Sequence, residues 1–380
     1  MKKIFIVIIL SFIFVSKMVY ADELIKATSG ILIEKDTGKV LYELNADKPL
    51  APASMTKMMT LLLTMEAVDN KIIKLSDKVV VSKDASSMGG SQVYLAENEK
   101  YRLDEIIKSV AIASANDGAV VLAEAIGGTK ENFVKMMNER AKELNLKNTN
   151  FTNVYGLDDK NHKSSARDMA IIASNLLNHP LILKYSSIYE SHLKRSDGTS
   201  LWMVNTNKLI RYYDGVDGLK TGYTKEAGYC LTATGQWNNL RLISVIMNDE
   251  TKEQRNKDTI ALLNYGRSNY KLKKLIDKSK SLGTVKVDLG ENYKTKVYVN
   301  KNISILSKLN EKEKKYSYKI KLKRLKAPVK KGSLAGELTI YQGDSIYKKV
   351  NLYTRENINK ISFKKTFFKI IITMISGTIP

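Results

Sequence analysis

A serine and a lysine three residues apart carry the clearest chemistry in the sequence. Ser54 and Lys57 would lie on the same face of a helix. A serine hydroxyl becomes a good nucleophile when a base removes its proton. Lys57 can be that base as a neutral amine, which requires burial or a neighbouring cation. At a helix start, Ser54 would also face backbone amides that favour developing negative charge. The pair alone is too common to identify a reaction.

Two further segments supply groups that such a reaction needs. Ser114-Ala115-Asn116 carries a hydroxyl that could relay a proton and an amide that could hold a substrate backbone. Lys220-Thr221-Gly222 carries a cation and a hydroxyl that could receive a carboxylate, while the glycine would let a substrate lie close to the strand. Alone, the first of these segments also fits a helix start or packing, and the second is uninformative. It is very improbable that all three segments occur together in this order by chance.

Apolar patterning predicts the elements that would position these side chains. A turn at 36–39 predicts a hairpin over 29–46, and a helix over 54–68 has apolar residues on most faces, as a central helix would. The other predicted elements are helices over 103–126, 131–145, 165–178 and 256–266 and strands over 228–235 and 240–248. Strands at both ends of a helical middle indicate a sheet flanked by helices.

From about residue 271 the pattern changes to that of a small β-rich domain. Apolar and lysine residues alternate over 284–289, 296–299 and 318–322, and turns are predicted at 290–292, 331–332 and 342–344. The chain carries 62 Lys and Arg against 39 Asp and Glu, and residues 271–354 hold 22 of the former and seven of the latter. This uneven basicity favours an anionic surface, either lipid headgroups or acidic wall polymers. Nucleic acid is a poor alternative, because residues 1–21 predict an exported chain, as described next.

The first residues of the chain predict export, and the last residues predict attachment to a membrane surface. Residues 1–21 have a basic start, an apolar run and small residues before a cleavage site, as a signal peptide does; an uncleaved anchor is the alternative. Residues 355–380 contain a stretch, 361–376, that would form an amphipathic helix too short to span a bilayer. We expect it to lie on the membrane surface; docking on the protein's own core is the alternative. The predicted domains are therefore 22–270 and 271–354, between a signal peptide and a tail.

The three chemical segments together are the signature of penicillin-binding proteins and class A β-lactamases. The chain resembles, more narrowly, the low-molecular-weight D-alanyl-D-alanine carboxypeptidases of the penicillin-binding protein 5 type. The segments that carry this resemblance are 52–60, 114–117, 153–158, 164–170, 205–209 and 218–233, together with the C-terminal β-rich domain and tail. The resemblance departs at Val154-Tyr155, where Pro-His is common, and at Tyr223, where His or Phe is frequent.

The resemblance implies an α+β fold: a β-lactamase/transpeptidase-like domain with an antiparallel sheet, then a β-rich domain and an amphipathic helix. It implies substrates that are peptidoglycan stem peptides ending in D-Ala-D-Ala, inhibition by β-lactams, and a place at the outer face of the cytoplasmic membrane. It implies no metal or cofactor. Ser54 would be acylated, and the backbone amides of Ser54 and Tyr223 would form an oxyanion hole. The implied catalytic residues are Ser54, Lys57 and Ser114, and the implied substrate-binding residues are Asn116, Lys220, Thr221, Gly222, Tyr223 and Arg255.

Competing functions find less support in the sequence. His162, His179 and His192 lie beside no nucleophile motif, no metalloprotease spacing occurs, and Cys230, in an apolar run, is expected to be buried in a strand. A class A β-lactamase would need a glutamate where Leu144-Asn145 is preceded by Ala141. A non-catalytic wall-binding scaffold of the same fold is the remaining alternative. For Arg255, a surface ion pair is the alternative to substrate binding.

Overall fold

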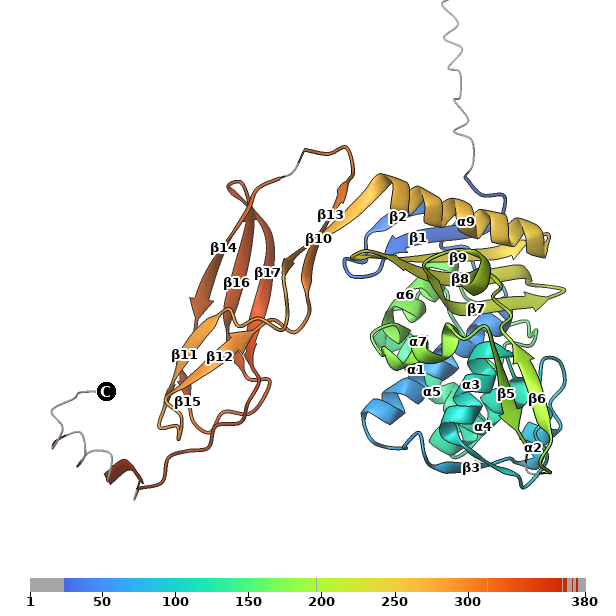
Figure 1. Ribbon diagram of the computed structural model, residues 1–380, viewed down its shortest axis with the longest axis horizontal. Coiled ribbons are helices and arrows are strands. Elements are labelled where there is room, and N and C mark those ends of the chain that lie inside the picture. The colour runs from blue at the N-terminus through green and yellow to red at the C-terminus, as the bar shows by residue number, and fades with distance from the viewer. Residues whose placement is uncertain are drawn as a thin grey trace, which may run out of the picture.

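The computed structural model describes residues 24–195, 197–312, 314–363, 365–367, 371 and 374. The predicted signal peptide and much of the predicted tail helix lie outside these residues. Figure 1 shows two parts side by side: a larger one that mixes helices and strands, and a smaller one built of strands. The α+β fold class is confirmed.

An antiparallel sheet of five strands organises the larger part, in the order β2-β1-β9-β8-β7. Its strands are β1 (Ser29–Glu34), β2 (Val40–Leu44), β7 (Val216–Thr224), β8 (Gly228–Trp237) and β9 (Leu240–Asp249). The interior strands β1 and β9 are buried over nearly their whole length because both faces of the sheet are covered. In this sheet β7, which carries Lys220-Thr221-Gly222, lies at one edge.

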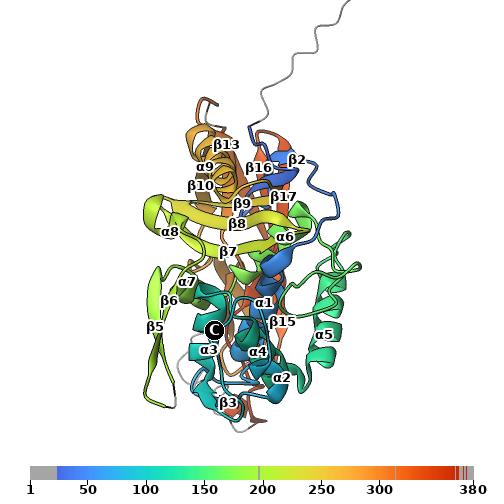
Figure 2. The same cartoon turned by 90° about the vertical axis from the view of Figure 1, so that its right-hand side faces the viewer.

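Helices cover the two faces of this sheet (Figures 1 and 2). On one face α9 (Lys252–Asn269) packs Leu262 and Leu263 against Leu242 and Ile246 of β9. The helical lobe on the other face surrounds α1 (Lys57–Asp69), which is buried almost throughout, as its apolar sequence predicts. The other helices are α2 (Lys83–Ser86), α3 (Leu103–Ile112), α4 (Asn116–Gly127), α5 (Lys130–Glu143), α6 (Ala166–Leu176), α7 (Leu181–Ser186) and α8 (Leu209–Tyr212). Two small two-stranded sheets complete this part: β3 (Lys78–Val80) with β4 (Lys100–Arg102), and β5 (Glu190–Lys194) with β6 (Ser200–Val204).

The single helix predicted over 103–126 is wrong, because the chain breaks between α3 and α4. Ser114 adopts a left-handed conformation with φ of 62°, which a helix cannot contain. The buried Asp117 carboxylate, which accepts hydrogen bonds from the amides of Val93 and Leu95, ties the start of α4 to the preceding loop. The predicted start of the last helix is also late: Thr251 caps α9 through the amide of Gln254, so the helix begins before Arg255.

The smaller part is a β-rich domain. β10 (Tyr270–Ile276) pairs with β13 (Ile303–Lys308), and a second sheet has the order β14-β16-β17-β12-β11-β15. Its strands are β11 (Gly283–Asp288), β12 (Lys294–Tyr298), β14 (Tyr316–Leu322), β15 (Leu325–Lys326), β16 (Leu334–Gln342) and β17 (Ser345–Thr354). Val285 and Val287 are buried and Lys286 between them is exposed, as period-two patterning predicts.

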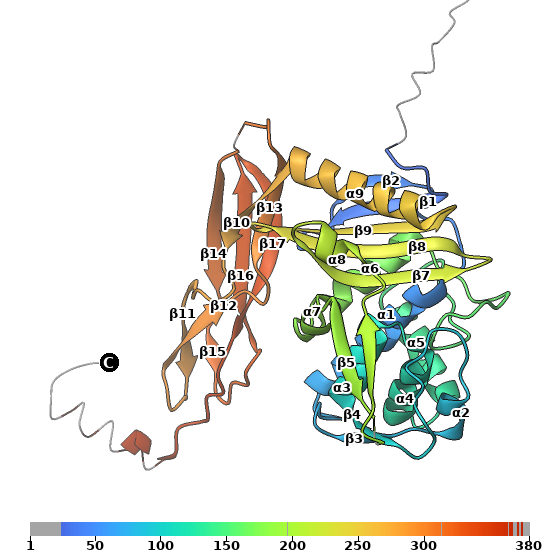
Figure 3. The same ribbon diagram turned by 45° about the vertical axis from the view of Figure 1, so that its right-hand side comes forward.

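The first residues of the predicted tail belong to this β-rich part. Ile358 is buried and bridges to Val329, and Lys360 bridges to Gly290. Beyond them, Phe363 and Phe367 are helical and exposed. This short described segment lies at the end of the β-rich domain that is remote from the helical lobe (Figures 1 and 3). Among the helices of the described residues, none is both long and apolar enough to cross a membrane.

Candidate active site

Ser54 lies on a short 3-10 helix, η1 (Ala53–Thr56), immediately before α1. We expected Ser54 at the start of the α-helix itself; it lies one turn earlier, after Ala53, whose φ is 46°. Ser54 is half-buried, whereas Lys57, the first residue of α1, has no exposed surface. The nucleophile therefore faces the outside while its candidate base is enclosed by the protein.

Lys57 has three hydrogen-bonding neighbours. Its Nζ lies 2.9 Å from Ser54 Oγ, 2.7 Å from Asn116 Oδ1 and 2.8 Å from the carbonyl oxygen of Tyr155. The last two can only accept hydrogen bonds. A neutral Lys57 amine has two N–H groups for these two acceptors, so its lone pair is directed at the Ser54 hydroxyl. This is the arrangement that a base for Ser54 needs.

The two acceptors are themselves fixed. The Asn116 side-chain Nδ2 donates to Gly89 O at 2.7 Å, which directs Oδ1 toward Lys57. The loop that carries Tyr155 turns around Asn153, whose Oδ1 accepts from the amides of Tyr155 and Gly156. Lys57 is thus held from α4 on one side and from the 153–156 loop on the other.

The 153–156 loop is packed directly on the nucleophile's helix. Thr60 Oγ1 of α1 donates to Val154 O at 2.7 Å. Gly156 has φ of +93°, and a Cβ at this position would lie 1.9 Å from Ala53 O. Only glycine fits both the conformation and the space. Nearby, His162 Nε2 lies 2.7 Å from Thr56 Oγ1, and burial lowers the pKa of His162 to about 4, so this histidine is a neutral packing residue.

Burial and positive charge keep Lys57 ready to accept a proton. Burial, then the charge of Lys220, lower the pKa of Lys57 well below its ordinary value, while Asp117 raises it. Burial and the charge of Arg255 lower the pKa of Lys220 to about 7. The buried cations therefore disfavour one another's charged forms, and an anionic substrate would relieve this repulsion.

Lys220, Thr221 and Gly222 lie on the edge strand β7, close to η1. Lys220 is buried, and its Nζ donates to Thr221 O at 3.0 Å. Thr221 Oγ1 donates to Thr206 Oγ1 at 2.7 Å. We expected Gly222 to make room for substrate; the structure adds that a Cβ there would lie 2.8 Å from Pro52 O and 3.1 Å from Ala53 Cβ. Gly222 thus also allows β7 to approach η1.

The remaining predicted residues take different places. Tyr223 is exposed, and its ring packs on that of Tyr229 with centroids 4.3 Å apart. Ser114 is buried at the break before α4; among the described residues Lys57 bonds to Ser54 and Asn116, and not to Ser114. Arg255 is only 3% exposed, so the surface ion pair considered above is wrong. Its Nη2 donates to Asn256 Oδ1 at 2.8 Å, and its charge acts on Lys220.

Sequence reasoning assigned no role in the site to several residues that support it, although segments 153–158 and 205–209 carried the resemblance. Tyr155 and Gly89 take part through backbone oxygens, which leave no trace in side-chain identity. Thr206 holds Thr221 through a hydroxyl, and Asn207 beside it donates to Gly218 O at 2.9 Å, which fixes this segment against β7. The Asn-Thr-Asn pattern at 205–207 was the available signal.

No other chemistry competes with this site in the part of the chain that the structure describes. No group of three or more His, Cys, Asp or Glu residues there could hold a metal ion. Cys230 is buried in β8, as predicted, and burial raises the pKa of its thiol to about 12, so it is a poor nucleophile. His179 and Asp69 form a surface pair.

Comparisons with known proteins agree with this site. The family model of D-alanyl-D-alanine carboxypeptidase matches residues 16–251, and that of the penicillin-binding protein 5 C-terminal domain matches residues 270–360. D-alanyl-D-alanine carboxypeptidase DacF of Bacillus subtilis is 44% identical over 345 residues, which cover 90% of this chain and 88% of the relative. D-alanyl-D-alanine carboxypeptidase DacA of Escherichia coli is 32% identical over 324 residues, which cover 83% of this chain and 79% of the relative.

Solved structures show the same kinship. Penicillin-binding protein 5 from Haemophilus influenzae matches with a TM-score of 0.69 and 31% identity, over 88% of this chain and 98% of that one. Penicillin-binding protein D2 from Listeria monocytogenes in its ampicillin-bound form matches with a TM-score of 0.58 and 32% identity, over 64% of this chain and 98% of that one. The chain belongs to the D-alanyl-D-alanine carboxypeptidase family of penicillin-binding serine peptidases.

Proposed function

We propose that the protein is a serine-type carboxypeptidase that removes the terminal D-alanine from peptidoglycan stem peptides through an acyl-enzyme on Ser54. The observation that carries this proposal is the position of Lys57 Nζ, 2.9 Å from Ser54 Oγ and held by two acceptors that cannot donate. Membership of the family supports the substrate class, and the geometry supports Ser54 as the nucleophile and Lys57 as its base.

The reaction has two halves. Neutral Lys57 takes the Ser54 proton as Oγ attacks the carbonyl carbon between the two D-alanines. The C–N bond then breaks, the proton passes to the departing amine through Lys57 or the Ser114 hydroxyl, and an ester on Ser54 remains. In the second half Lys57 takes a proton from water, the water oxygen attacks the ester, and Ser54 recovers its proton as the acid leaves.

Substrate binding follows from the edge position of β7. An extended peptide can lie along this strand, with its terminal carboxylate at Lys220 and Thr221 and with the buried charge of Arg255 behind them. The scissile carbonyl would then reach the amides of Ser54 and Tyr223, an oxyanion hole whose donors are each typically worth about 3–4 kcal/mol in the transition state. Asn116, which already holds Lys57, would also hold the substrate backbone.

Specific residues argue against each of the two alternatives, a class A β-lactamase and a non-catalytic scaffold. A β-lactamase of class A needs a carboxylate that activates the deacylating water. Ala141, which stands at that place in the sequence, is buried in α5. We therefore propose that β-lactams acylate Ser54 and are released slowly. A non-catalytic scaffold has no use for a buried lysine beside a half-exposed serine, since burying an amine is costly.

Release of D-alanine from a peptide ending in D-Ala-D-Ala tests the proposed reaction. We expect the parent protein to release it and Ser54→Ala to release almost none. Ser86→Ala, which changes a serine in α2 of the same lobe, is the control and should behave as the parent. Equal release by the parent and Ser54→Ala would overturn the mechanism.

We also propose an exported protein, processed near residue 21, whose tail holds it on the outer face of the cytoplasmic membrane. The exposed Phe363 and Phe367, with Lys365 beside them, support an amphipathic surface. Because Ile358 is buried in the β-rich domain, the anchoring residues begin after it. Deletion of residues 362–380 should therefore release the protein from anionic membranes and leave its melting temperature unchanged. Retention on the membrane would contradict this proposal.

A further inference from the structure

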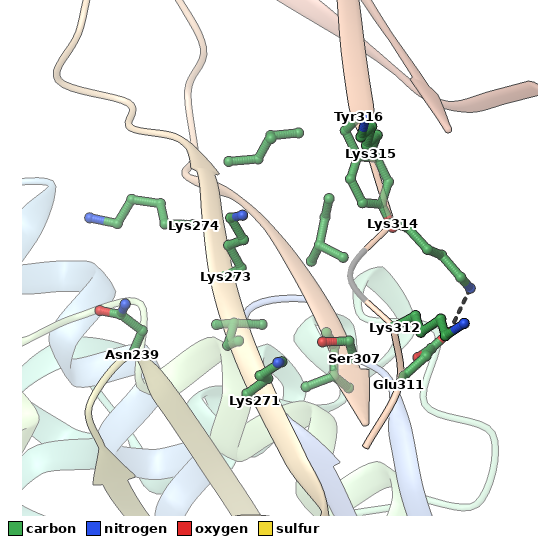
Figure 4. A pocket seen from close by; sticks show the side chains of 14 residues that line it. Asn239, Lys271, Lys273, Lys274, Ser307, Glu311, Lys312, Lys314, Lys315 and Tyr316 are labelled. Carbon is green, nitrogen blue, oxygen red and sulfur yellow. Dashed lines mark ion pairs between the residues drawn. The ribbon is translucent and has the colours of Figure 1, made fainter. Parts of the chain in front are cut away.

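A lysine-lined groove lies in the β-rich domain, where it adjoins the catalytic domain. It has a volume of about 770 Å³. Its lining comes from β10, β13, the segment before β14, and Asn239 in the turn between β8 and β9 (Figure 4). The groove is remote from Ser54 in the chain and shares no residue with the active site.

The charge of the groove is strongly one-sided. Among the described residues, six lysines line it against one acidic residue, Glu311. Lys314 pairs with Glu311 at 2.7 Å, and Lys274 pairs with Asp277 at 3.1 Å. Within the described part of the chain, no ion pair engages Lys271, Lys312 or Lys315. These three ammonium groups are available to an external anion.

The geometry of β10 places its lysines at the groove. Lys271 and Lys273 alternate with the buried Leu272 along β10, so both lysines leave the strand on the face opposite to Leu272, and both line the groove. The cross-strand partner of Lys271 on β13 is Ser307, which cannot neutralise a lysine. In Figure 4 the β10 lysines lie on one side of the groove and Lys312 and Lys314 on the other.

Apolar residues also line the groove. Leu272 and Ile305 are 8% and 7% exposed, and Leu275 and Leu306 are half-buried beside them. A ligand with a carbon backbone and negative charges along it matches this combination, because its charges can reach the lysines while its carbons contact the apolar lining.

We infer that this groove binds a linear phosphodiester polymer of the cell wall, of the polyol-phosphate class. A groove with cations on opposite walls encloses a chain, whereas a flat lipid surface would reach only its rim. The bound polymer would hold the protein within the wall, independently of the tail, and would present the catalytic domain to neighbouring stem peptides. This role is additional to the hydrolysis at Ser54.

Binding of poly(glycerol phosphate) to the purified protein, followed by calorimetry over a range of salt concentrations, tests the inference. The groove variant carries Lys271→Gln, Lys312→Gln and Lys315→Gln. The matched control carries Lys286→Gln, Lys321→Gln and Lys348→Gln, which remove the same charge from exposed strand positions outside the groove. Phosphatidylglycerol vesicles form a second arm that distinguishes a lipid surface from the polymer.

We expect the parent to bind the polymer and the groove variant to bind about tenfold or more weakly, with a log–log salt slope shallower by about two. The control should stay within about twofold of the parent. D-alanine release from a short peptide should be equal in all three proteins. If the triple variant fails to fold, the single change Lys271→Glu on the exposed side of β10 makes the same comparison with Lys286→Glu. Equal weakening in groove and control variants, or parent binding to vesicles but not to the polymer, would overturn the inference.

Discussion

Asn116 Oδ1 accepts a hydrogen bond of 2.7 Å from Lys57 Nζ, and this contact joins the first residue of α4 to the first residue of α1. Because the other end of the Asn116 amide donates to Gly89 O, the oxygen cannot turn away. The amide therefore aims the lysine at Ser54 without placing a negative charge beside it. A carboxylate at this place would favour the charged form of Lys57 and disable the base.

This relationship predicts the effect of Asn116→Asp. The new carboxylate should raise the pKa of Lys57, so the neutral form needed for catalysis would appear only at higher pH. We expect kcat/KM near pH 7 to fall by about a hundredfold or more, and the acidic limb of the pH profile to move upward. Asn116→Ala is the control: it should lose activity without that upward movement. An unmoved limb in Asn116→Asp would show that Lys57 is not the base.

Lys220 predicts a basic limb in the same profile. With a pKa of about 7 in the free enzyme, Lys220 is charged below that pH and loses its charge above it. We expect kcat/KM for a carboxylate-ended peptide to fall as pH rises through about 7. Lys220→Arg should lower activity but remove this limb, since arginine stays charged.

A peptide with an amidated C-terminus is the matched substrate for this test. It offers no carboxylate, so its hydrolysis should lack the basic limb in the parent protein. Persistence of the limb with this substrate, or in Lys220→Arg, would assign it to another group.

Thr206 is predicted to act as a positioning residue. Thr206→Val removes the acceptor of the Thr221 hydroxyl and nearly conserves its volume. A lost hydrogen bond of about 1 kcal/mol corresponds to a rise in KM of about fivefold, and kcat should change little. Thr206→Ser keeps the acceptor and should restore KM. If valine and serine give the same KM, the hydroxyl contact has no part in binding.

Gly156 is predicted to be required for both fold and activity. In Gly156→Ala the Cβ would meet Ala53 O, and the residue would keep an unfavourable φ. We expect the free energy of unfolding to fall by about 2–4 kcal/mol in urea denaturation. Gly38→Ala is the control, because Gly38 also has a positive φ, of +70°, but no atom lies within 4 Å of its added Cβ.

The control should lose only about 1 kcal/mol and keep its full rate of D-alanine release. Gly156→Ala should lose that activity as well, because the displaced Ala53 adjoins Ser54. Equal destabilisation by the two substitutions would mean that the close approach to η1 is not a constraint.

Much of this fold could be predicted because the patterning is local. The hairpin at 29–46, the central helix and strands β8 and β9 all follow apolar periodicity that a single segment carries. The break at Ser114 could not be predicted, because it depends on the Asp117 carboxylate binding amides of a loop more than twenty residues earlier. Similarly, the start of α9 depends on the Thr251 cap rather than on periodicity.

The active site also contains both residues that the sequence predicts and residues whose roles depend on the tertiary structure. Ser54, Lys57, Asn116 and Lys220 were visible as side-chain types at characteristic spacings. Tyr155 could not be found in this way, since it contributes a carbonyl oxygen that every residue possesses. The roles of Gly156 and Gly222 emerge only when η1 is placed between them, because the space that a glycine leaves is a tertiary property.

The most direct test of Ser54 as the nucleophile is the mass of the intact protein after brief exposure to penicillin, followed by peptide mapping. We predict a single covalent adduct, located on the peptide that contains Ser54, that decays slowly and is absent from Ser54→Ala. An adduct that forms equally on Ser54→Ala, or that maps to another residue, would contradict the account.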